Sequence, residues 1–179
     1  MTNYRRSNIA GASYFFTVNL ADRSSSLLTE QIALLRTAFK YAQTRHPFTI
    51  DAIAVLPDHL HTLWTLPDRD NDFALRWRLI KTEFSRGLPH REHCSASRKT
   101  KGERGIWQRR YWEHLIRDDL DFARHVDYIH INPVKHGWVK QVADWPHSSF
   151  HRYVRAGILP MDWAGSAEDK WECGERGEC

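Results

Sequence analysis

Cysteine and long apolar runs are scarce in this chain of 179 residues. Its three cysteines, Cys94, Cys173 and Cys179, are odd in number and form no C-x-x-C pair. They therefore predict neither a disulfide framework nor a zinc knuckle, and they fit a reducing compartment. No stretch reaches the roughly 18 apolar residues of a membrane span, and the N-terminus lacks the apolar core of a signal peptide. We expect a cytoplasmic protein with no membrane partner.

The charge is distributed unevenly along the chain. The formal net charge is +4, but the segment from Asp162 to Cys179 carries six acidic and two basic residues, so the remainder stands at +8. The length fits one domain that can bury a core without disulfides or a structural metal. We expect this domain over residues 1–160 and a flexible acidic tail over 161–179.

Most of the positive charge lies between residues 76 and 110. Eleven basic residues fall there against three glutamates. One interpretation is a surface that faces a polyanion, and the other is a solvated helix face followed by a loop. Tryptophans in the same region suggest stacking on single-stranded nucleic acid, although most tryptophans are simply core. The DNA-contacting candidates are Arg76, Arg78, Lys81, Arg86, Arg109 and Arg110.

The spacing of apolar residues predicts secondary structure in the order β, α, β, β, α, β, α. This order indicates an α+β fold, ferredoxin-like or RRM-like, with a single antiparallel sheet and helices packed on one side. Asp118 or Asp119 is expected to cap the last long helix, and Pro133 is expected to end it. The elements are expected over residues 12–20, 24–46, 48–56, 59–66, 73–87, 106–116 and 119–132, with a loop over 88–105 and a short final helix over 145–154.

The stretch PDHLHTLW places two histidines one residue apart in a predicted strand. Residues i and i+2 of a strand point to the same side, so His59 and His61 can present two imidazoles to one point. Imidazole binds zinc, manganese and other borderline ions. Two ligands make only half of a metal site, however, and such a pair is also found as partly buried, hydrogen-bonded histidines.

The last long helix carries a polar stripe beside its apolar one. His125, Tyr128 and Asn132 fall at i, i+3 and i+7, so they share one side of the helix. The Asn132 amide oxygen is a candidate third metal ligand, and a tyrosine beside a metal is a candidate nucleophile toward phosphorus. The alternative is a half-buried tyrosine with Asn132 capping the helix end before Pro133.

Four segments together resemble a known family. These are YRRSNIAGASYFFTVNL, PDHLHTLWTLP, IWQRRYWEHLIRDD and DYIHINPVKHGWV. They are similar to the REP-associated tyrosine transposases, a bacterial branch of the single-tyrosine HUH transposases, and the likeness runs from about Tyr4 to Tyr153. The family binds and cuts REP palindromes, which are repeated extragenic hairpins in bacterial genomes, as single strands.

The resemblance implies a role for each matching residue. His59 and His61 correspond to the two histidines of the HUH motif, Tyr128 to the nucleophilic tyrosine, and Asn132 to the third metal ligand, where insertion-sequence relatives carry glutamine. It implies a divalent metal, Mg²⁺ or Mn²⁺, and a 5′-phosphotyrosine intermediate in DNA cleavage and rejoining. It also suggests a monomer in the bacterial cytoplasm.

Two other functions fit the same residues. The chain could be a non-catalytic module that binds hairpin DNA or RNA, with His59 and His61 structural. It could also be a metal-dependent nuclease that cuts with an activated water, in which case Tyr128 would be dispensable. No general base is assigned, and His114, His125 and His130 are interpreted as structural.

Overall fold

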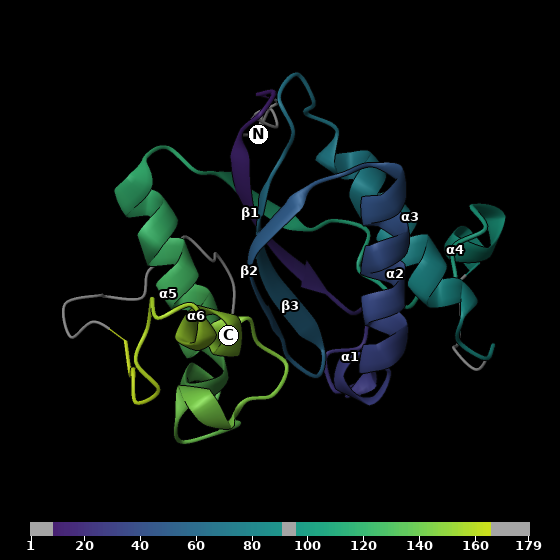
Figure 1. Ribbon diagram of the computed structural model, residues 1–179. Helices are drawn as coiled ribbons and strands as arrows, with labels where there is room; N and C mark the ends of the chain where they lie inside the picture. The colour runs from purple at the N-terminus through teal and green to yellow at the C-terminus, as the bar shows by residue number, and fades with distance from the viewer. Residues whose placement is uncertain (1–8, 91–95, 166–179) are drawn as a thin grey trace, which may run out of the picture.

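The centre of the molecule is a four-stranded antiparallel sheet with the strand order β2-β3-β1-β4 (Figure 1). The structure is a computed structural model that describes residues 9–90 and 96–165. β2 and β3 form the hairpin expected on either side of Pro57. The single antiparallel sheet is therefore confirmed. Its strands are β1 (Ser13–Asn19), β2 (Thr49–Val55), β3 (His59–Thr65) and β4 (Trp112–Leu115).

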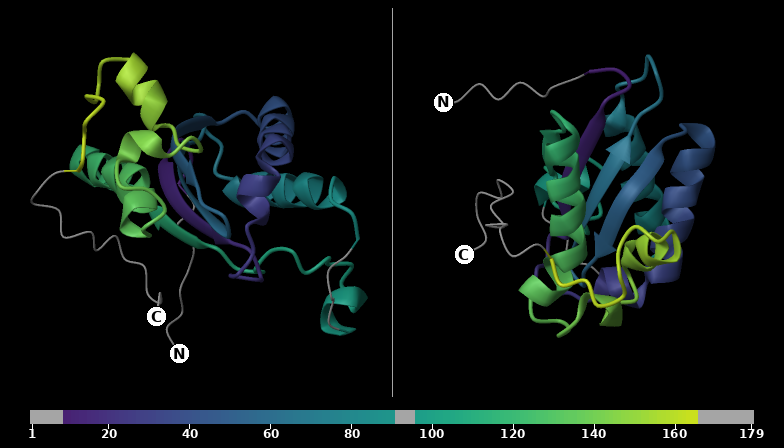
Figure 2. Two further views of the ribbon diagram at one scale, coloured as in Figure 1. Left: turned by 90° about the horizontal axis from the view of Figure 1, so that it is seen from below. Right: turned by 60° about the vertical axis from the view of Figure 1, so that its left-hand side comes forward.

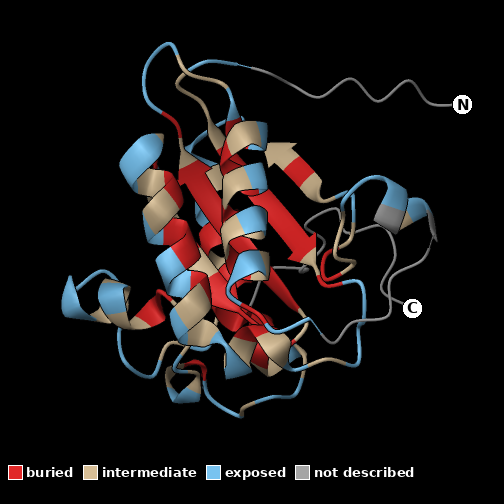
Figure 3. Cartoon of the chain, turned by 90° about the vertical axis from the view of Figure 1, so that its right-hand side faces the viewer, coloured by how far each residue is buried: buried red, intermediate tan, exposed pale blue. Residues whose placement is uncertain are grey.

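Helices cover both faces of this sheet. α2 and α3 pack on one face and α5 packs on the other, so that the sheet lies between α5 and α2 in the right-hand view of Figure 2. The two central strands, β1 and β3, are almost entirely buried behind α2 and α3 (Figure 3). The helices are α1 (Leu27–Glu30), α2 (Ile32–Arg45), α3 (Phe73–Arg86), α4 (Ala96–Thr100), α5 (Asp119–Lys135) and α6 (Phe150–Arg155), with a 3₁₀ turn at Val142–Asp144.

The prediction that the helices pack on one side of the sheet is wrong. The two central strands carry large apolar side chains in both orientations. Phe16 and Trp64 point into the core under α2 and α3, whereas Phe15 and Leu63 point into the core under α5. Because apolar surface on both sides of a strand must be removed from water, the sheet needs a helical layer on each face.

Two predicted boundaries differ for local reasons. The helix expected over 24–46 is divided at Gln31, where the backbone leaves the helical region and separates α1 from α2. The helix expected to end at Pro133 continues to Lys135. Proline removes only its own donor, and the His136 amide still donates to the Asn132 carbonyl at 3.0 Å. The helical turn therefore closes around Pro133.

The segment before α5 is less regular than expected. β4 begins only at Trp112, and the preceding residues reach β1 through a single bridge between Trp107 and Leu20. The loop expected over 88–105 contains α4, and its residues 91–95 lie outside the described part of the chain. The final helix begins at Phe150 rather than Trp145. Most of the predicted acidic tail, residues 166–179, also lies outside the described residues.

α5 is positioned by its N-terminal cap and its apolar stripe. The Asp118 carboxylate accepts a hydrogen bond from the Asp121 amide at 2.8 Å, which confirms Asp118 as the N-cap. Val126 and Ile129 pack against the sheet. This packing sets the rotation of α5 about its axis, and it turns Tyr128 toward β3.

Candidate active site

His59 and His61 converge on one side of β3. Both rings lie on the face of the sheet that α5 covers, and their centroids are 4.9 Å apart at an angle of 85°. Both side chains are buried. The alternation of a strand therefore places the two imidazoles at one point, as the spacing predicted.

Each of these imidazoles is oriented through its Nδ1 atom. His59 Nδ1 donates to Asp58 Oδ1 at 2.8 Å, and His61 Nδ1 is hydrogen-bonded to the Thr17 hydroxyl at 2.9 Å. In both rings Nε2 is then the atom that can bind a metal. His59 Nε2 is buried and has no hydrogen-bond partner among the described residues. An oriented histidine with its second nitrogen unused is the arrangement of a metal ligand.

The surroundings of His61 favour a neutral ring. Burial would raise the pKa of Asp58, but its hydrogen bond with His59 and the nearby Arg23 guanidinium lower that pKa to about 2. Asp58 is therefore ionised at neutral pH. Burial lowers the pKa of His61 well below 6.5, and electrostatic interaction with the neighbouring His59 and His136 lowers it further. A neutral imidazole is the form that can coordinate a metal ion.

A second row of side chains on α5 faces this pair. Tyr128, Asn132 and His136 follow one another at intervals of four residues, so they lie along one side of the helix. The Tyr128 ring lies 5.3 Å from the His61 ring, and the His136 ring lies 5.1 Å from the His59 ring. Tyr128 therefore contacts His61 at one end of this row, and His136 contacts His59 at the other end. Asn132 lies between these two contacts.

Asn132 is completely buried, and its amide lacks protein partners. Neither Oδ1 nor Nδ2 has a hydrogen-bond partner among the described residues. An unsatisfied buried polar group costs about 1–3 kcal/mol, so such a group points to a ligand. The alternative interpretation, a capping residue at the helix end, does not agree with a helix that continues to Lys135.

The histidine cluster is compatible with a divalent metal ion. One ligand atom of each of His59, His61 and His136 lies within 4.8 Å of the others. Three imidazoles beside an unsatisfied amide oxygen are donors that borderline divalent ions accept. His136 was not identified from the sequence, although its position one turn beyond Asn132 was a usable signal.

Tyr128 is buried at the inner end of the same row. Its side chain is 1% exposed, and its ring meets Phe15 edge-on at 5.9 Å. The Lys135 ammonium lies 4.8 Å from the centroid of the Tyr128 ring. A cation at this distance can offset negative charge that is brought to the tyrosine. The site therefore combines a phenol, a cation and a candidate metal centre.

The other histidines near this face have structural hydrogen bonds. His114 Nε2 and His125 Nδ1 both bond to Asp121, at 2.9 Å to its carboxylate and 2.8 Å to its backbone carbonyl respectively. His130 Nε2 bonds to the Ser149 hydroxyl at 2.9 Å. These contacts agree with the structural roles expected for all three.

Arg76 is not a DNA-contacting residue, and that prediction is wrong. Its side chain is completely buried. Its guanidinium binds both carboxylate oxygens of Asp70, at 2.7 and 3.0 Å, and donates to the backbone carbonyls of His46, Pro47 and Asp72. Helical periodicity turns this arginine inward, where an ion pair and backbone acceptors compensate for its burial.

The remaining basic candidates are of two kinds. Arg78, Arg86 and Arg110 are exposed. By contrast, Lys81 donates to the Gln108 carbonyl at 3.1 Å, and Arg109 is paired with Glu103 at 2.8 Å. The first group is exposed to bind phosphate, although Arg86 also lies 4.0 Å from a Glu83 carboxylate oxygen. Lys81 and Arg109 are held by closer contacts within the protein.

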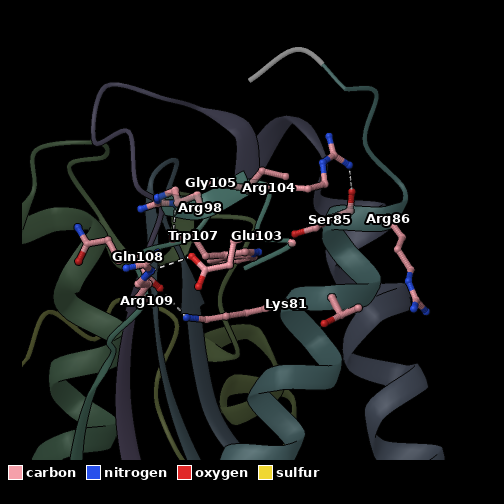
Figure 4. Close-up of a pocket in the computed structure, with 13 residues that line it drawn as sticks. Lys81, Ser85, Arg86, Arg98, Glu103, Arg104, Gly105, Trp107, Gln108 and Arg109 are labelled. Atoms are coloured by element: carbon pink, nitrogen blue, oxygen red, sulfur yellow. Dashed lines mark hydrogen bonds and ion pairs between the residues drawn. The ribbon is translucent and has the colours of Figure 1, made fainter. Parts of the chain in front are cut away.

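A pocket of about 580 Å³ separates α3 from the segment that follows α4 (Figure 4). Lys81 and Arg86 line it from α3, and Arg98, Arg104 and Arg109 line it from the other side. Arg104 donates to the carbonyls of Ser85 and Leu88, so it ties the segment to the end of α3. Because α3 and α5 cover opposite faces, this basic pocket and the histidine site are separated by the sheet.

The tryptophans of the basic region are mostly core residues. Trp77 is 1% exposed and Trp107 is 8% exposed, and both belong to the core under α2 and α3. They are therefore not available to stack on bases. Within the described ranges, no helix is both long enough and apolar enough to cross a membrane.

An antiparallel sheet with paired histidines on a central strand, facing a helix that carries a tyrosine, is the arrangement that the resemblance to the HUH transposases implies. Comparison with known proteins agrees. The chain is 51% identical to a REP-associated tyrosine transposase of Escherichia coli (strain K12) over 176 residues, which cover 98% of each chain. It is also 51% identical, over 171 residues, to a Haemophilus influenzae protein assigned to the same group, covering 95% of this chain and 97% of the other.

A solved structure shows the same likeness. The structure of a REP-associated tyrosine transposase bound to a REP hairpin matches the whole of this chain with a TM-score of 0.84 and 50% identity, and the match covers all of both chains. No protein-family model matches the sequence. The chain belongs to the REP-associated tyrosine transposases.

Proposed function

We propose that this transposase binds REP-type hairpins and cleaves and rejoins the DNA strand through a covalent bond to Tyr128. The observation that carries the proposal is the paired arrangement of β3 and α5, in which the Tyr128 ring lies against the His61 ring with Asn132 one turn away. The hairpin bound to the solved relative supports DNA of this kind as the partner.

The residues have distinct roles in this proposal. His59, His61 and Asn132 hold a divalent ion, Mg²⁺ or Mn²⁺, which when bound supplies positive charge for the non-bridging oxygens of the scissile phosphate. Asp58 and Thr17 keep the two imidazoles in the orientation that presents Nε2. Lys135 adds a second positive charge beside Tyr128.

Tyr128 is the nucleophile. The Tyr128 phenol releases its proton to solvent and its oxygen forms a bond to phosphorus. The bond between phosphorus and the 3′ oxygen breaks, and the leaving oxygen takes up a proton from solvent to become a 3′-hydroxyl. The 5′ phosphate stays on the tyrosine. Because the phosphodiester energy is conserved in this bond, a 3′-hydroxyl can later displace Tyr128 and reseal the strand without ATP.

The hairpin reaches two faces of the protein in this proposal. Phosphates of the hairpin bind the exposed arginines Arg78, Arg86 and Arg110, while the strand to be cut passes the β4 edge of the sheet toward α5. Tyr128 is buried, so the strand must displace the groups that cover its hydroxyl before attack. We expect one copy of the chain to suffice for cleavage.

A gel experiment tests the covalent step. The full chain is incubated with labelled single-stranded hairpin DNA and Mn²⁺ and then denatured. We expect a denaturant-resistant protein–DNA band that is absent with Tyr128→Phe and with EDTA. Tyr14→Phe is the matched control, because Tyr14 is equally buried but lies on the opposite face of the sheet.

The same gel separates the two other functions. Strand cutting without a covalent band, and its persistence in Tyr128→Phe, would indicate a nuclease that uses water and would exclude the proposal. Binding that responds to salt but not to chelation, with neither cutting nor a covalent band, would indicate a non-catalytic binding module.

A further inference from the structure

The row on α5 does not end at Asn132. His136 lies one turn further along the same side of the helix, and its ring meets the His59 ring at 5.1 Å and 68°. We propose that His136 is a third imidazole ligand of the metal ion held by His59, His61 and Asn132. This inference rests on the proposed function and specifies the metal site on which that function depends.

The distances within the cluster suit a shared ion. One ligand nitrogen of each of the three histidines lies within 4.8 Å of the other two. Two metal–nitrogen bonds of about 2.0–2.1 Å allow their nitrogens to lie at most about 4.2 Å apart, so small side-chain rotations bring all three into coordination. Asn132, which lies between the Tyr128 and His136 contacts, adds an oxygen donor.

The backbone around His136 is held rigidly. His136 is the C-cap of α5, and Gly137 follows with φ of +72°. The Gly137 amide donates to the Val134 carbonyl at 2.9 Å, and the Trp138 amide donates to the Pro133 carbonyl at 3.0 Å. These two bonds form a Schellman motif, which fixes the end of a helix. The position of His136 is therefore set by the helix terminus rather than by a flexible loop.

His136 is also the most accessible of the three histidines. His59 and His61 are 2% and 0% exposed, whereas His136 is half-buried. An ion therefore reaches the buried pair from the side of His136. His136 and Lys135 lie close enough to His61 to lower the pKa of its imidazole, so the end of α5 and the HUH pair share one electrostatic environment.

Three imidazoles change which ion the site prefers. Mg²⁺ is a hard cation that prefers oxygen ligands and retains its waters, whereas Mn²⁺, Co²⁺ and Zn²⁺ accept imidazole nitrogen. A site with three nitrogens and one amide oxygen selects the second group. The proposal therefore predicts that Mn²⁺ binds the DNA-free protein more tightly than Mg²⁺ does.

Metal binding to the full chain without DNA tests the role of His136. Mn²⁺ affinity is measured by electron paramagnetic resonance, and the Co²⁺ complex is followed by its visible absorption spectrum. We expect His136→Ala to weaken Mn²⁺ binding by at least about ten-fold and to change the Co²⁺ spectrum. His151→Ala is the matched control, because His151 is a half-buried histidine on α6, and it should leave both readouts unchanged.

A second variant keeps the test decisive if alanine disturbs the fold. His136→Asp retains a ligand atom, and we expect it to bind Mn²⁺ more tightly than His136→Ala and to bind Mg²⁺ relatively better than the wild type. Wild-type Mn²⁺ affinity and an unchanged Co²⁺ spectrum in both variants would overturn the proposal.

Failure of this inference is distinguishable from failure of the proposed function. If His136→Ala retains its metal affinity while the wild type forms the Tyr128 adduct, His136 is not a ligand and the covalent mechanism stands. If His136→Ala loses the metal but the wild type forms no adduct, His136 is a ligand of a metal site that serves another reaction.

Discussion

Residues that are not themselves proposed metal ligands determine how the histidine rings are oriented. The hydrogen bond from His59 Nδ1 to Asp58 orients the ring and directs Nε2 into the site. The pKa of Asp58, lowered to about 2, keeps this acceptor ionised at every pH at which the metal can bind. A carboxylate behind a metal-binding histidine also raises the basicity of the ligand.

Removal of this carboxylate should weaken metal binding without removing a ligand. We expect Asp58→Ala to reduce Mn²⁺ affinity by about 10- to 100-fold, measured by isothermal titration calorimetry, because His59 loses its orientation. Asp68→Ala is the control, since Asp68 is an exposed aspartate beyond the other end of β3. Equal affinities of the two variants would show that Asp58 does not act through His59.

His130 links the stability of the protein to pH. Burial lowers its pKa from 6.5 to about 3, and the nearby positive charge of Arg152 contributes. The ring packs against Phe150 and Tyr153, so it stays neutral in the folded protein. In the unfolded chain the same ring takes up a proton below about pH 6.5.

This difference makes the stabilising contribution of His130 depend on pH. It is fully present above the unfolded pKa of 6.5, and it is lost as the pH falls from there toward about 3, because only the unfolded chain then binds the proton. Between these values His130 should make the free energy of unfolding of the wild type fall by at most about 1.4 kcal/mol for each unit by which the pH decreases. We expect His130→Gln to lack this contribution. Urea unfolding across this range measures it, and parallel profiles for variant and wild type would contradict the assignment.

At the scale of elements, α5 carries most of the residues of the proposed active site, and its two ends have different roles. The N-terminal end is capped by Asp118, whose carboxylate accepts from the Asp121 amide. The C-terminal end is closed by the Schellman motif at Gly137 and presents His136. Tyr128 and Asn132 lie between the two ends, where the apolar stripe holds the helix against the sheet.

Loss of the N-cap should reduce stability more than activity. We expect Asp118→Ala to lower the free energy of unfolding by about 1 kcal/mol, because one amide of the first turn loses its acceptor. Asp119→Ala is the matched control, since it removes the same charge from the same end of the helix while leaving the cap intact. Urea unfolding compares the two, and the covalent-adduct gel should give similar yields below the melting temperature. A similar loss of stability in both variants would attribute the effect to charge rather than to the cap.

At the scale of the whole molecule, the positive charge and the histidine site lie on different faces of one sheet. The basic residues are grouped on α3 and in the segment before β4, whereas α5 covers the other face. A hairpin that contacts both must pass around an edge or an end of the sheet. Electrostatic binding and cleavage can therefore be altered separately.

The salt dependence of hairpin binding tests whether the exposed arginines contribute to DNA binding. We expect the combined change of Arg78, Arg86 and Arg110 to alanine to weaken hairpin binding and to reduce the slope of log affinity against log salt by about 0.7–0.9 for each phosphate that the protein no longer neutralises. Lys40→Ala, an exposed lysine on α2 outside the basic region, should leave the slope unchanged. An unaltered slope in the triple variant would place the DNA-binding face elsewhere.

Local patterns in the sequence were sufficient for most of the elements and for the histidine pair, the tyrosine and the asparagine of the candidate site. Alternation in β3 placed His59 and His61 on one side, and the interval of four residues placed Tyr128 and Asn132 on one side of α5. These relations depend only on the repeat of a strand or of a helix, which is a property of neighbouring residues. The sequence thus determined the single sheet, the histidine pair, the candidate nucleophile and, through its resemblance, the family.

Tertiary structure alone decided the relations between distant segments. It showed that the sheet is covered on both faces, that the Arg76 guanidinium meets the carbonyls of His46 and Pro47, and that His136 meets His59 across more than seventy residues of chain. Each of these depends on which surfaces pack together to remove apolar area from water, and on which charges are paired in the process. Helix and strand periodicity places a residue on a face, but the packing of the whole chain determines what that face meets.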